Sequence, residues 1–306
     1  MTRRLNWFLL ALLLVVGLPF YWLMIDNRPG DAPVKPVSIA QLRQLASSVP
    51  GPAPSAVEME LVGWRRLPGS LFVAGSGIKR KLVGVMAWRL PVDGGKAVVI
   101  DSGLTRTDAE AMGMEVYYPQ IQARIERALD EAGLVLVTHE HPDHQGALVA
   151  RGGAPLLQAA RLNPGQLPRA PLAATLAWPT GAAPTARLAP DGPQAVAPGV
   201  VVIPAPSHTP GSQMIYVRLS SGREFLFAGD IATFAQSWQQ VRARSRLVGD
   251  HLAKEDRREV YSWLQTIAAL SRQAPGLVIL PGHDTEWIGD PEHRVPVRSG
   301  FTLGPV

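Results

Sequence analysis

Three histidines and two acids crowd six consecutive positions of this 306-residue chain, in the stretch HEHPDH that follows Thr138. Side chains two residues apart in an extended loop point the same way, so His139 and His141 can address one position. Asp143 and His144 can then turn toward a second position a few ångströms away. Imidazole and carboxylate groups are metal ligands, and this spacing suits two ions. The stretch therefore predicts a metal centre.

Further ligands are expected where later strands end. A buried-strand pattern at 134–137 runs directly into the histidine loop, and apolar runs at 200–203, 224–228 and 277–280 precede His208, Asp230 and His283. A pair of ions needs roughly three protein ligands each plus a bridging group. His208 can complete one set with His139 and His141, and His283 can complete the other with Asp143 and His144. Asp230, with two oxygens, can bridge.

This ligand pattern resembles the metallo-β-lactamase superfamily from about residue 57 onward. The resemblance rests on His-x-His-x-Asp-His, then His208 in PSHTPGSQ, Asp230 in FAGDIA and His283 in LPGHD. It implies an α/β fold, a four-layer αββα sandwich with the metals at the sheet edges between the two β-layers. It also implies that Asp101, in VVIDSG, orients the ligating histidines from behind. The alternative for Asp101 is an ordinary Asp-Ser-Gly turn.

Within the superfamily, the presence of both His144 and Asp230 is similar to the lactonase, glyoxalase II and ribonuclease Z branches, and disfavours a β-lactam substrate. HTPGS and GHD resemble N-acyl-homoserine lactonases, although Thr233 stands where those enzymes place a tyrosine that contacts the substrate. Only 23 residues follow His283, which disfavours a glutathione thioester. Ser207 replaces the usual glycine before the histidine, which costs free energy if that position needs a positive φ.

The ligand set predicts hydrolysis. The chain has no cysteine, so the metal must be held by nitrogen and oxygen, and two Zn²⁺ ions per chain are expected, with iron or manganese as alternatives. Two cations sharing a water lower its pKa from 15.7 toward about 7, so a metal-bound hydroxide would attack an ester, lactone or related acyl bond. Asp143 or Asp230 would carry the proton to the leaving group. The alternatives are a mononuclear-iron oxidoreductase resembling persulfide dioxygenases, a ribonuclease Z-like phosphodiesterase and a non-catalytic binding module.

Composition limits the partners. A hydrophobic content of 46% indicates one large core, and the formal charge of +5, without a dense basic run, gives no sign of nucleic-acid binding. A small-molecule acyl substrate is the expected partner. His251 and His293 lack a ligand partner pattern and are expected at the surface or at a helix start. The segment 234–247, which holds Trp238, Arg242, Arg244 and Arg246, is either a lining of the substrate cleft or a solvated helix.

The N-terminus predicts a membrane anchor in residues 1–26. After Arg3 and Arg4, the uncharged run 7–24 is long enough to cross ~27 Å of hydrocarbon as a helix, with tryptophan or tyrosine near both ends. The two arginines place the N-terminus in the cytoplasm, and the catalytic domain of this single-pass protein on the periplasmic or extracytoplasmic side. A cleaved signal peptide is the alternative, but the apolar segment is long and ends without a small-x-small site.

The rest of the chain divides into a proline-rich tether at 27–56 and one domain at 57–306. The tether carries a short helix at 38–48, capped by Ser38, whose apolar face can dock on the domain. In the domain, strands are expected at 57–64, 70–74, 81–90 and 97–100, and helices at 118–132 and 255–270. The region 163–198 is rich in proline and alanine and receives no assignment.

Overall fold

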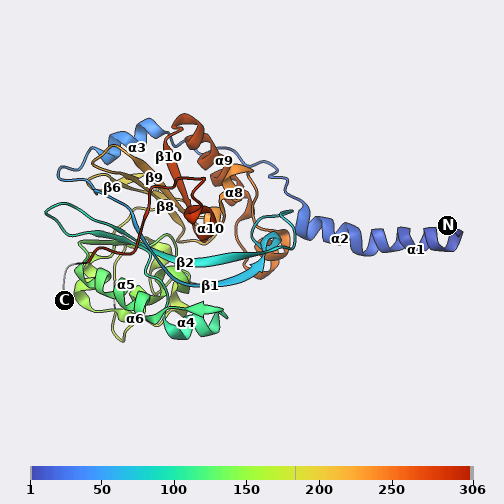
Figure 1. The fold of residues 1–306 in the computed structure, drawn as a ribbon, viewed down its shortest axis with the longest axis horizontal. Helices are drawn as coiled ribbons and strands as arrows, with labels where there is room; N and C mark the ends of the chain where they lie inside the picture. The colour runs from blue at the N-terminus through green and yellow to red at the C-terminus, as the bar shows by residue number, and fades with distance from the viewer. Residues whose placement is uncertain (1, 183, 304–306) are drawn as a thin grey trace.

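The computed structural model describes residues 2–182 and 184–303, so the expected outer limits of the anchor at residue 1 and of the domain at residue 306 lie outside it. Within these residues the strands form two sheets that stack between two layers of helices (Figure 1). The expected αββα sandwich is therefore confirmed.

The first sheet has the strand order β11-β1-β2-β3-β5, with β4 paired to β1. The antiparallel hairpin of β1 and β2 is its longest ladder, and β3 pairs with β5 in parallel. The strands are β1 (Glu58–Pro68), β2 (Arg80–Leu90), β3 (Val98–Ile100), β4 (Val116–Tyr117), β5 (Leu134–Leu136) and β11 (Arg298–Ser299).

The second sheet has the order β10-β9-β8-β7-β6, antiparallel except for the parallel pair of β9 and β10. Its strands are β6 (Gln194–Ala197), β7 (Val200–Pro204), β8 (Gln213–Arg218), β9 (Glu224–Gly229) and β10 (Leu277–Pro281). The two inner faces meet in an apolar core, in which Trp88 of the first sheet packs edge-on against Phe227 of the second at 5.2 Å between ring centroids. This packing fixes the two sheet edges relative to one another.

Helices cover both outer faces (Figure 1). The first sheet is covered by α4 (Arg106–Ala111), α5 (Pro119–Glu131), α6 (Ala147–Arg151) and α7 (Ala154–Ala159), and the second by α3 (Ile39–Ala46) and α9 (Arg257–Gln273). The short helices α8 (Ala235–Gln239) and α10 (Thr285–Gly289) follow β9 and β10. In α5, buried Ile125 and Leu129 lie one turn apart, as its apolar spacing predicts.

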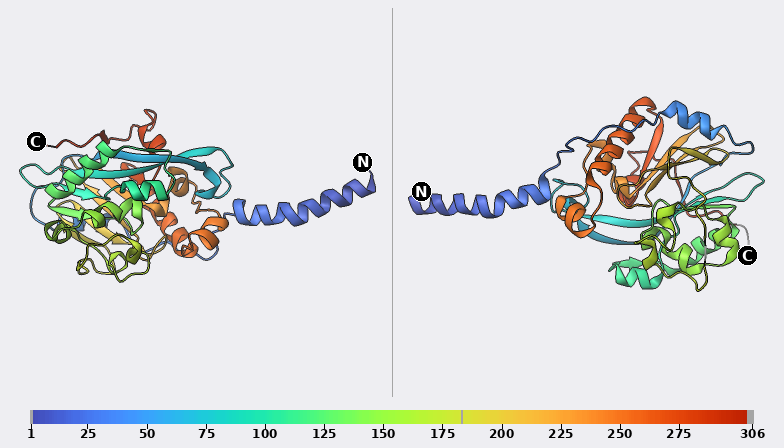
Figure 2. Two further views of the ribbon diagram at one scale, coloured as in Figure 1. Left: turned by 90° about the horizontal axis from the view of Figure 1, so that it is seen from below. Right: turned by 180° about the vertical axis from the view of Figure 1, so that it is seen from behind.

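A helix continuous from Arg3 to Ile25 projects from one end of the domain, and includes α1 (Arg3–Leu12) and α2 (Leu18–Phe20) (Figures 1 and 2). It is 23 residues long with a mean hydropathy of 2.5, and its apolar side chains are exposed. Among the described residues it is the helix long and apolar enough to cross a membrane or to serve as a signal sequence.

The predicted helix in the tether is present and docked. The Ser38 hydroxyl accepts a hydrogen bond from the Gln41 amide at 3.2 Å, which caps α3 as expected, and Leu42 is fully buried against the second sheet. Arg43 forms a bidentate ion pair with Glu224 at 2.7 and 2.6 Å. At least this part of 27–56 is therefore packed on the domain.

The strand expected at 70–74 is wrong. These residues form the tip of the β1–β2 hairpin, which begins with the helical turn Gly69–Leu71. The chain reverses there because Gly75 and Gly77 adopt positive φ, a conformation that side-chain-bearing residues avoid. Strand β8 was not predicted; the HTPGSQ motif at 208–213 ends in its first residue, Gln213. The region 163–198 contains short turns at Pro164–Gln166 and Ala173–Thr175, and then β6.

Candidate metal centre

The histidine loop leaves β5 and forms the helical turn Pro142–Gly146. Asp101, at the end of β3, holds this loop from below. Its Oδ1 accepts a hydrogen bond from the Thr138 amide at 2.7 Å, and its Oδ2 lies 2.9 Å from Nδ1 of His144. Asp101 is buried with a φ of 58°, a strained value for a residue other than glycine. The carboxylate therefore lies where the sequence places an outer partner of the ligating histidines.

Four ligand-type side chains meet on one side of the loop: His139, His141, His208 and Asp230, called here the four-residue group. Nε2 of His139 lies 2.9 Å from Nδ1 of His141, which lies 3.3 Å from Nε2 of His208. His208 Nε2 is 3.6 Å from Asp230 Oδ2. The loop after β5 and the ends of β7 and β9 thus converge on one point.

Three more meet beside it: Asp143, His144 and His283, the three-residue group. Nε2 of His144 and Nε2 of His283 are 3.4 Å apart, and both lie near Asp143 Oδ2, at 3.8 and 3.6 Å. Asp230 joins the groups, because its Oδ1 lies 2.8 Å from His283 Nε2 while its Oδ2 faces His208. The structure therefore brings together all seven predicted ligands in the predicted two sets, with Asp230 between them.

The spacing of the donor atoms matches the spacing of atoms that share one bound cation. Two atoms that bind one tetrahedral zinc at 2.0–2.1 Å are about 3.3 Å apart, which is close to the spacings found here. Asp230 Oδ1 is buried and lies 2.8 Å from Nε2 of His283 and 3.6 Å from Nε2 of His144, which are themselves ligand-type atoms. A cation between these atoms would satisfy the carboxylate and leave the imidazoles neutral.

Outer contacts orient three of the imidazoles. His144 has Asp101, and His208 Nδ1 lies 3.0 Å from Oε2 of the buried Glu255. His283 Nδ1 donates to the backbone carbonyl of Gly84 at 2.7 Å. Each contact is made through Nδ1, so Nε2 of each ring faces the centre. Sequence reasoning missed Glu255, which it placed at the start of a helix; α9 begins at Arg257, so Glu255 lies in the loop before it.

Arg244 brings a positive charge to the same place. Its Nη2 donates to Asp230 Oδ2 at 2.6 Å and to the Thr233 hydroxyl at 3.0 Å, and its side chain is buried. The Thr233 hydroxyl is thus engaged with Arg244. The guanidinium fixes the outer oxygen of Asp230 and leaves its other oxygen to the three-residue group.

The electrostatics of the two groups differ. Burial, and then neighbouring His208, lower the pKa of His141 to about 3. Burial acts to lower the pKa of His144, but the charges of Asp101 and Asp143 act more strongly in the other direction. The net result is a pKa raised to about 10. Burial acts to raise the pKa of Asp230, yet His283 and Arg244 hold it well below its usual range. The groups are therefore poised to be neutral around His141 and protonated at His144.

Glycine permits the close approach of the strand ends. A Cβ on Gly282 would lie 2.4 Å from Asp230 Oδ1 and 2.9 Å from the Gly229 carbonyl. The GHD motif therefore needs glycine for its packing. Ser207 is not among the residues with positive φ, so the cost expected for serine there does not arise.

A cleft of about 370 Å³ opens over the centre. Its floor includes His141, Asp143, Asp230, Arg244 and His283, and its walls are mainly apolar. The wall residues come from β1 and β2 with their hairpin tip, from the segment after α4, and from the turn Leu247–Leu252 with its flank: Arg65, Leu71, Phe72, Val83, Met112, Met114, Pro142, Val248 and Ala253.

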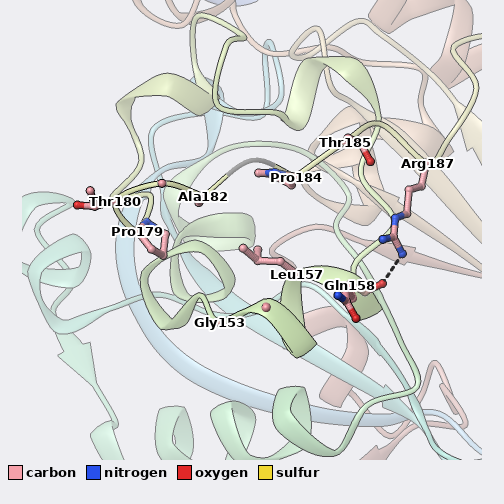
Figure 3. Close-up of a pocket in the computed structure, with 11 residues that line it drawn as sticks. Gly153, Leu157, Gln158, Pro179, Thr180, Ala182, Pro184, Thr185 and Arg187 are labelled. Carbon is pink, nitrogen blue, oxygen red and sulfur yellow. Dashed lines mark hydrogen bonds between the residues drawn. The ribbon is translucent and has the colours of Figure 1, made fainter.

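A larger hollow, about 480 Å³, lies elsewhere, between α7 and the segment that contains Pro179 and Arg187 (Figure 3). Its charged lining residue, Arg187, donates from Nη1 to the carbonyl of Gln158 at 2.6 Å. Small and aliphatic side chains make up much of the remainder. The chemistry therefore lies in the smaller cleft.

The segment 234–247 only partly fulfils its prediction. Arg244 lines the cleft, but Arg242 donates to the carbonyl of Ala74, and Arg246 pairs with Asp26 at 2.9 Å. Trp238 packs against the core behind the second sheet. The segment is also no continuous solvated helix, because α8 ends at Gln239. His251 is exposed, and His293 stacks on Trp287, both away from the ligand groups.

Comparison with known families agrees with this geometry. A family model described as a β-lactamase superfamily domain matches residues 97–283, which contain the seven ligand-type residues and Asp101. The chain belongs to this superfamily. The superfamily is one of metal-dependent hydrolases, and both ligand groups of this member lie within the matched residues.

Solved structures show the same superfamily fold. A quorum-quenching N-acyl homoserine lactone lactonase is 15% identical with a TM-score of 0.57, over 77% of this chain and 94% of its own. An N-acyl homoserine lactone hydrolase, with the product N-hexanoyl-L-homoserine at its catalytic metal centre, is 15% identical with a TM-score of 0.56, over 78% and 96%. A probable metal-dependent hydrolase from Staphylococcus aureus is 14% identical with a TM-score of 0.51, over 76% and 90%. No curated protein matches the chain.

Proposed function

We propose that this superfamily member is a membrane-anchored hydrolase with two zinc ions, which cleaves an ester, lactone or related acyl bond. The observation that carries the proposal is the position of Asp230, whose two oxygens face two adjacent groups of ligand atoms at the floor of one cleft. Three ligands and the bridge would give each ion four protein donors, and a zinc that expands to five-coordinate would keep one position for water, as catalytic sites require.

The donor chemistry favours zinc. Five imidazoles and two carboxylates, without any thiolate, suit zinc and also the alternatives iron and manganese. His139, His141, His208 and Asp230 would hold one ion, and Asp143, His144 and His283, together with Asp230, the other. Two bound zinc ions would supply Lewis acidity toward a carbonyl oxygen and a water of lowered pKa.

The side chains of the cleft would transfer the proton, stabilise charge on the substrate and orient the histidines. Asp143 lines the cleft, so its carboxylate would carry a proton toward the leaving oxygen, with Asp230 as the other candidate. Arg244 is fixed by Asp230 and Thr233, and its charge would stabilise a negatively charged substrate group. Asp101 and Glu255 would keep His144 and His208 in the orientation that presents Nε2.

An acyl substrate fits this cleft better than a nucleic acid. The walls are mainly apolar, with Arg65 and Arg244 as their cationic residues, which gives room for a carbon chain and little grip on a phosphate backbone. Two of the structural neighbours act on N-acyl homoserine lactones. The same carbonyl chemistry is therefore proposed for this chain, with the acyl chain against the apolar walls.

Retention of the N-terminal helix is supported by its contacts. The Trp22 ring lies 3.9 Å from the Arg246 guanidinium, and the buried Asp26, one residue beyond the helix, pairs with the same arginine. A segment removed after export would not need such contacts with the folded domain. Arg3 and Arg4 favour a cytoplasmic N-terminus, which places the domain on the periplasmic or extracytoplasmic side.

Metal analysis and turnover test the proposal together. The full-length protein, stripped by a chelator and reloaded with zinc, should contain two zinc ions per chain and hydrolyse members of a panel of acyl esters and lactones. The same preparation should leave phosphodiesters and β-lactams intact. One iron per chain with oxygen uptake on a persulfide would contradict the hydrolase and favour the dioxygenase alternative.

A further inference from the structure

Two segments that line the cleft lie at the end of the domain from which the N-terminal helix projects. Figure 2 shows the tip of the β1–β2 hairpin and the segment before α9 beside the base of this helix. The Gly75 amide of the hairpin tip donates to the Met24 carbonyl at 2.9 Å. On the other side, Arg246, at the start of the turn Leu247–Leu252, contacts Trp22 and Asp26. Both segments are thus attached to the end of the helix.

The same two segments form part of the cleft rim. Leu71 and Phe72 of the hairpin tip line the cleft, and so do Val248 and Ala253 of the segment around Leu247–Leu252. An object in contact with both segments would therefore lie at the cleft entrance.

Each rim segment also exposes a large apolar side chain. Ile78, in the hairpin tip, is 78% exposed, and Leu252, at the end of the turn, is 70% exposed. Outside the N-terminal helix these are the two most exposed large apolar side chains of the described residues. Lys79 and Lys254 lie next to them and are also exposed. Apolar tips flanked by lysines suit a membrane surface with anionic lipid headgroups.

We propose that the cleft rim sits on the bilayer through Ile78 and Leu252, and that the enzyme takes an amphiphilic acyl ester directly from the lipid. The inference rests on the proposed function for its substrate class. The N-terminal helix sets the height of the rim, because its last residues contact both rim segments. The apolar walls, which include Met112 and Met114, accept the acyl chain as it leaves the bilayer. Hydrolysis then breaks the bond between acyl carbon and oxygen, water adds, and a carboxylic acid and an alcohol form.

The absence of native cysteine gives a direct test of position. Single variants Ile78→Cys and Leu252→Cys of the full-length chain carry a nitroxide spin label and are reconstituted in vesicles of phosphatidylcholine and phosphatidylglycerol. Val15→Cys, on the exposed face of the N-terminal helix, reports the anchor, and Leu172→Cys is the matched control. Leu172 is 38% exposed and lies in the region 163–198, outside the cleft lining.

Relaxation by oxygen, which concentrates in lipid, is compared with relaxation by a water-soluble nickel chelate. The labels at 15, 78 and 252 should favour oxygen, and the label at 172 should favour nickel. If the label at 15 lies in lipid while those at 78 and 252 match the control, the contact of the rim with the bilayer is overturned and the membrane anchor is supported. If the label at 15 also lies in water, both the membrane anchor and the contact of the rim with the bilayer are overturned. None of these results depends on turnover.

The substrate class is tested by a ratio of activities. For the double variant Ile78→Asp and Leu252→Asp, kcat/KM on a vesicle-borne long-chain ester, divided by kcat/KM on a soluble short-chain ester, should fall at least tenfold, mainly through KM. Leu172→Asp should keep the wild-type ratio. An unchanged ratio in the double variant overturns the proposal. No hydrolysis of any ester, with the labels at 78 and 252 in lipid, overturns the acyl substrate and supports the bilayer contact alone.

Discussion

The two ligand groups share the same sheets but differ in what stands behind them. Each takes side chains from the loop after β5 in the first sheet and from strand ends in the second, so each cation would cross-link both halves of the sandwich. Behind the four-residue group lies Glu255, on His208, with Arg244 beside it. Behind the three-residue group lie Asp101, on His144, and the Gly84 carbonyl, on His283.

This difference has an electrostatic consequence. Two carboxylates, Asp101 and Asp143, raise the pKa of His144, whereas burial and neighbouring imidazoles lower the pKa of His139 and His141. The four-residue group is thus ready to accept a cation, and the three-residue group must first release a proton. We expect the two positions to fill under different conditions.

Loss of Asp230 should have the largest effect, because its two oxygens face both groups and it is the proposed bridge between the ions. Asp230→Ala should lower turnover by a factor on the order of 10³ and reduce the metal content of the purified protein. Asp284→Asn is the control: Asp284 is buried nearby, but it caps α10 at the Trp287 amide. It should change thermal stability and leave metal content intact. Full turnover by Asp230→Ala would contradict the bridging role.

Removal of one histidine from each group should separate them. His208→Ala should lose the metal of the four-residue group, and His283→Ala that of the three-residue group, so each variant should hold about one ion per chain in place of two. Turnover should fall on the order of 10²-fold or more, since the remaining ion lacks its partner. The measurement is metal content by mass spectrometry after desalting. Loss of both ions from both variants would show that the groups are not separable.

The outer carboxylates should have smaller effects. Asp101→Asn and Glu255→Gln each keep the shape of the side chain and remove its charge, and asparagine tolerates the positive φ at position 101. Each should weaken zinc affinity about 10- to 100-fold. Competition with a chromophoric chelator should show the weak position to be the three-residue group for Asp101→Asn and the four-residue group for Glu255→Gln. Equal weakening of both positions by one variant would mean that the groups behave as one.

The pH dependence should distinguish the groups further. The pKa of His144 is raised to about 10, so this histidine holds a proton below that value and competes with the metal. Zinc affinity of the three-residue group should therefore rise about tenfold per pH unit between pH 6 and 8 if one proton is released. The pKa of His141 is lowered to about 3, so the four-residue group should depend much less on pH in this range. Isothermal titration with zinc in matched buffers measures both, and identical slopes would contradict the difference.

The larger hollow should give the smallest effect. Arg187→Ala removes its cation and the hydrogen bond to the Gln158 carbonyl, far from either ligand group. Zinc content and turnover should match the wild type. A fall of tenfold or more in kcat/KM would show that this hollow, and not only the cleft over the ligands, takes part in binding.

Local pattern found the side chains that the structure brings together because each follows a strand within a few residues. The periodicity of an apolar strand and the residue that follows it are encoded within about ten positions, so His208, Asp230 and His283 were found without a structure. The strand expected at 70–74 failed for the same reason: Leu71 to Ala74 is apolar, but the glycines at 75 and 77 turn the chain there. A short apolar run by itself does not distinguish a strand from the tip of a hairpin.

Glu255 and Arg244 make contacts that the local sequence pattern does not predict. Glu255 meets His208 across 47 positions and lies in a loop that no periodicity marks. Arg244 was grouped with Arg242 and Arg246 because all three lie in the one segment that follows Asp230, yet only Arg244 of the three lines the cleft. Which of these arginines turns inward depends on the packing of the hairpin tip and of Asp26 against the other two.

The sequence by itself determined the ligand-type side chains, their order along the chain and an N-terminal helix apolar enough to span a membrane, because each is encoded by neighbouring residues, and the resemblance of the ligand pattern implied the layered fold. Only the tertiary structure decided that the two oxygens of Asp230 face different groups, that Glu255 and Arg244 stand behind one of them, and that two segments lining the cleft contact the end of that helix. Those relations depend on how two sheets pack face to face, and contacts between distant segments follow from the shape of the core.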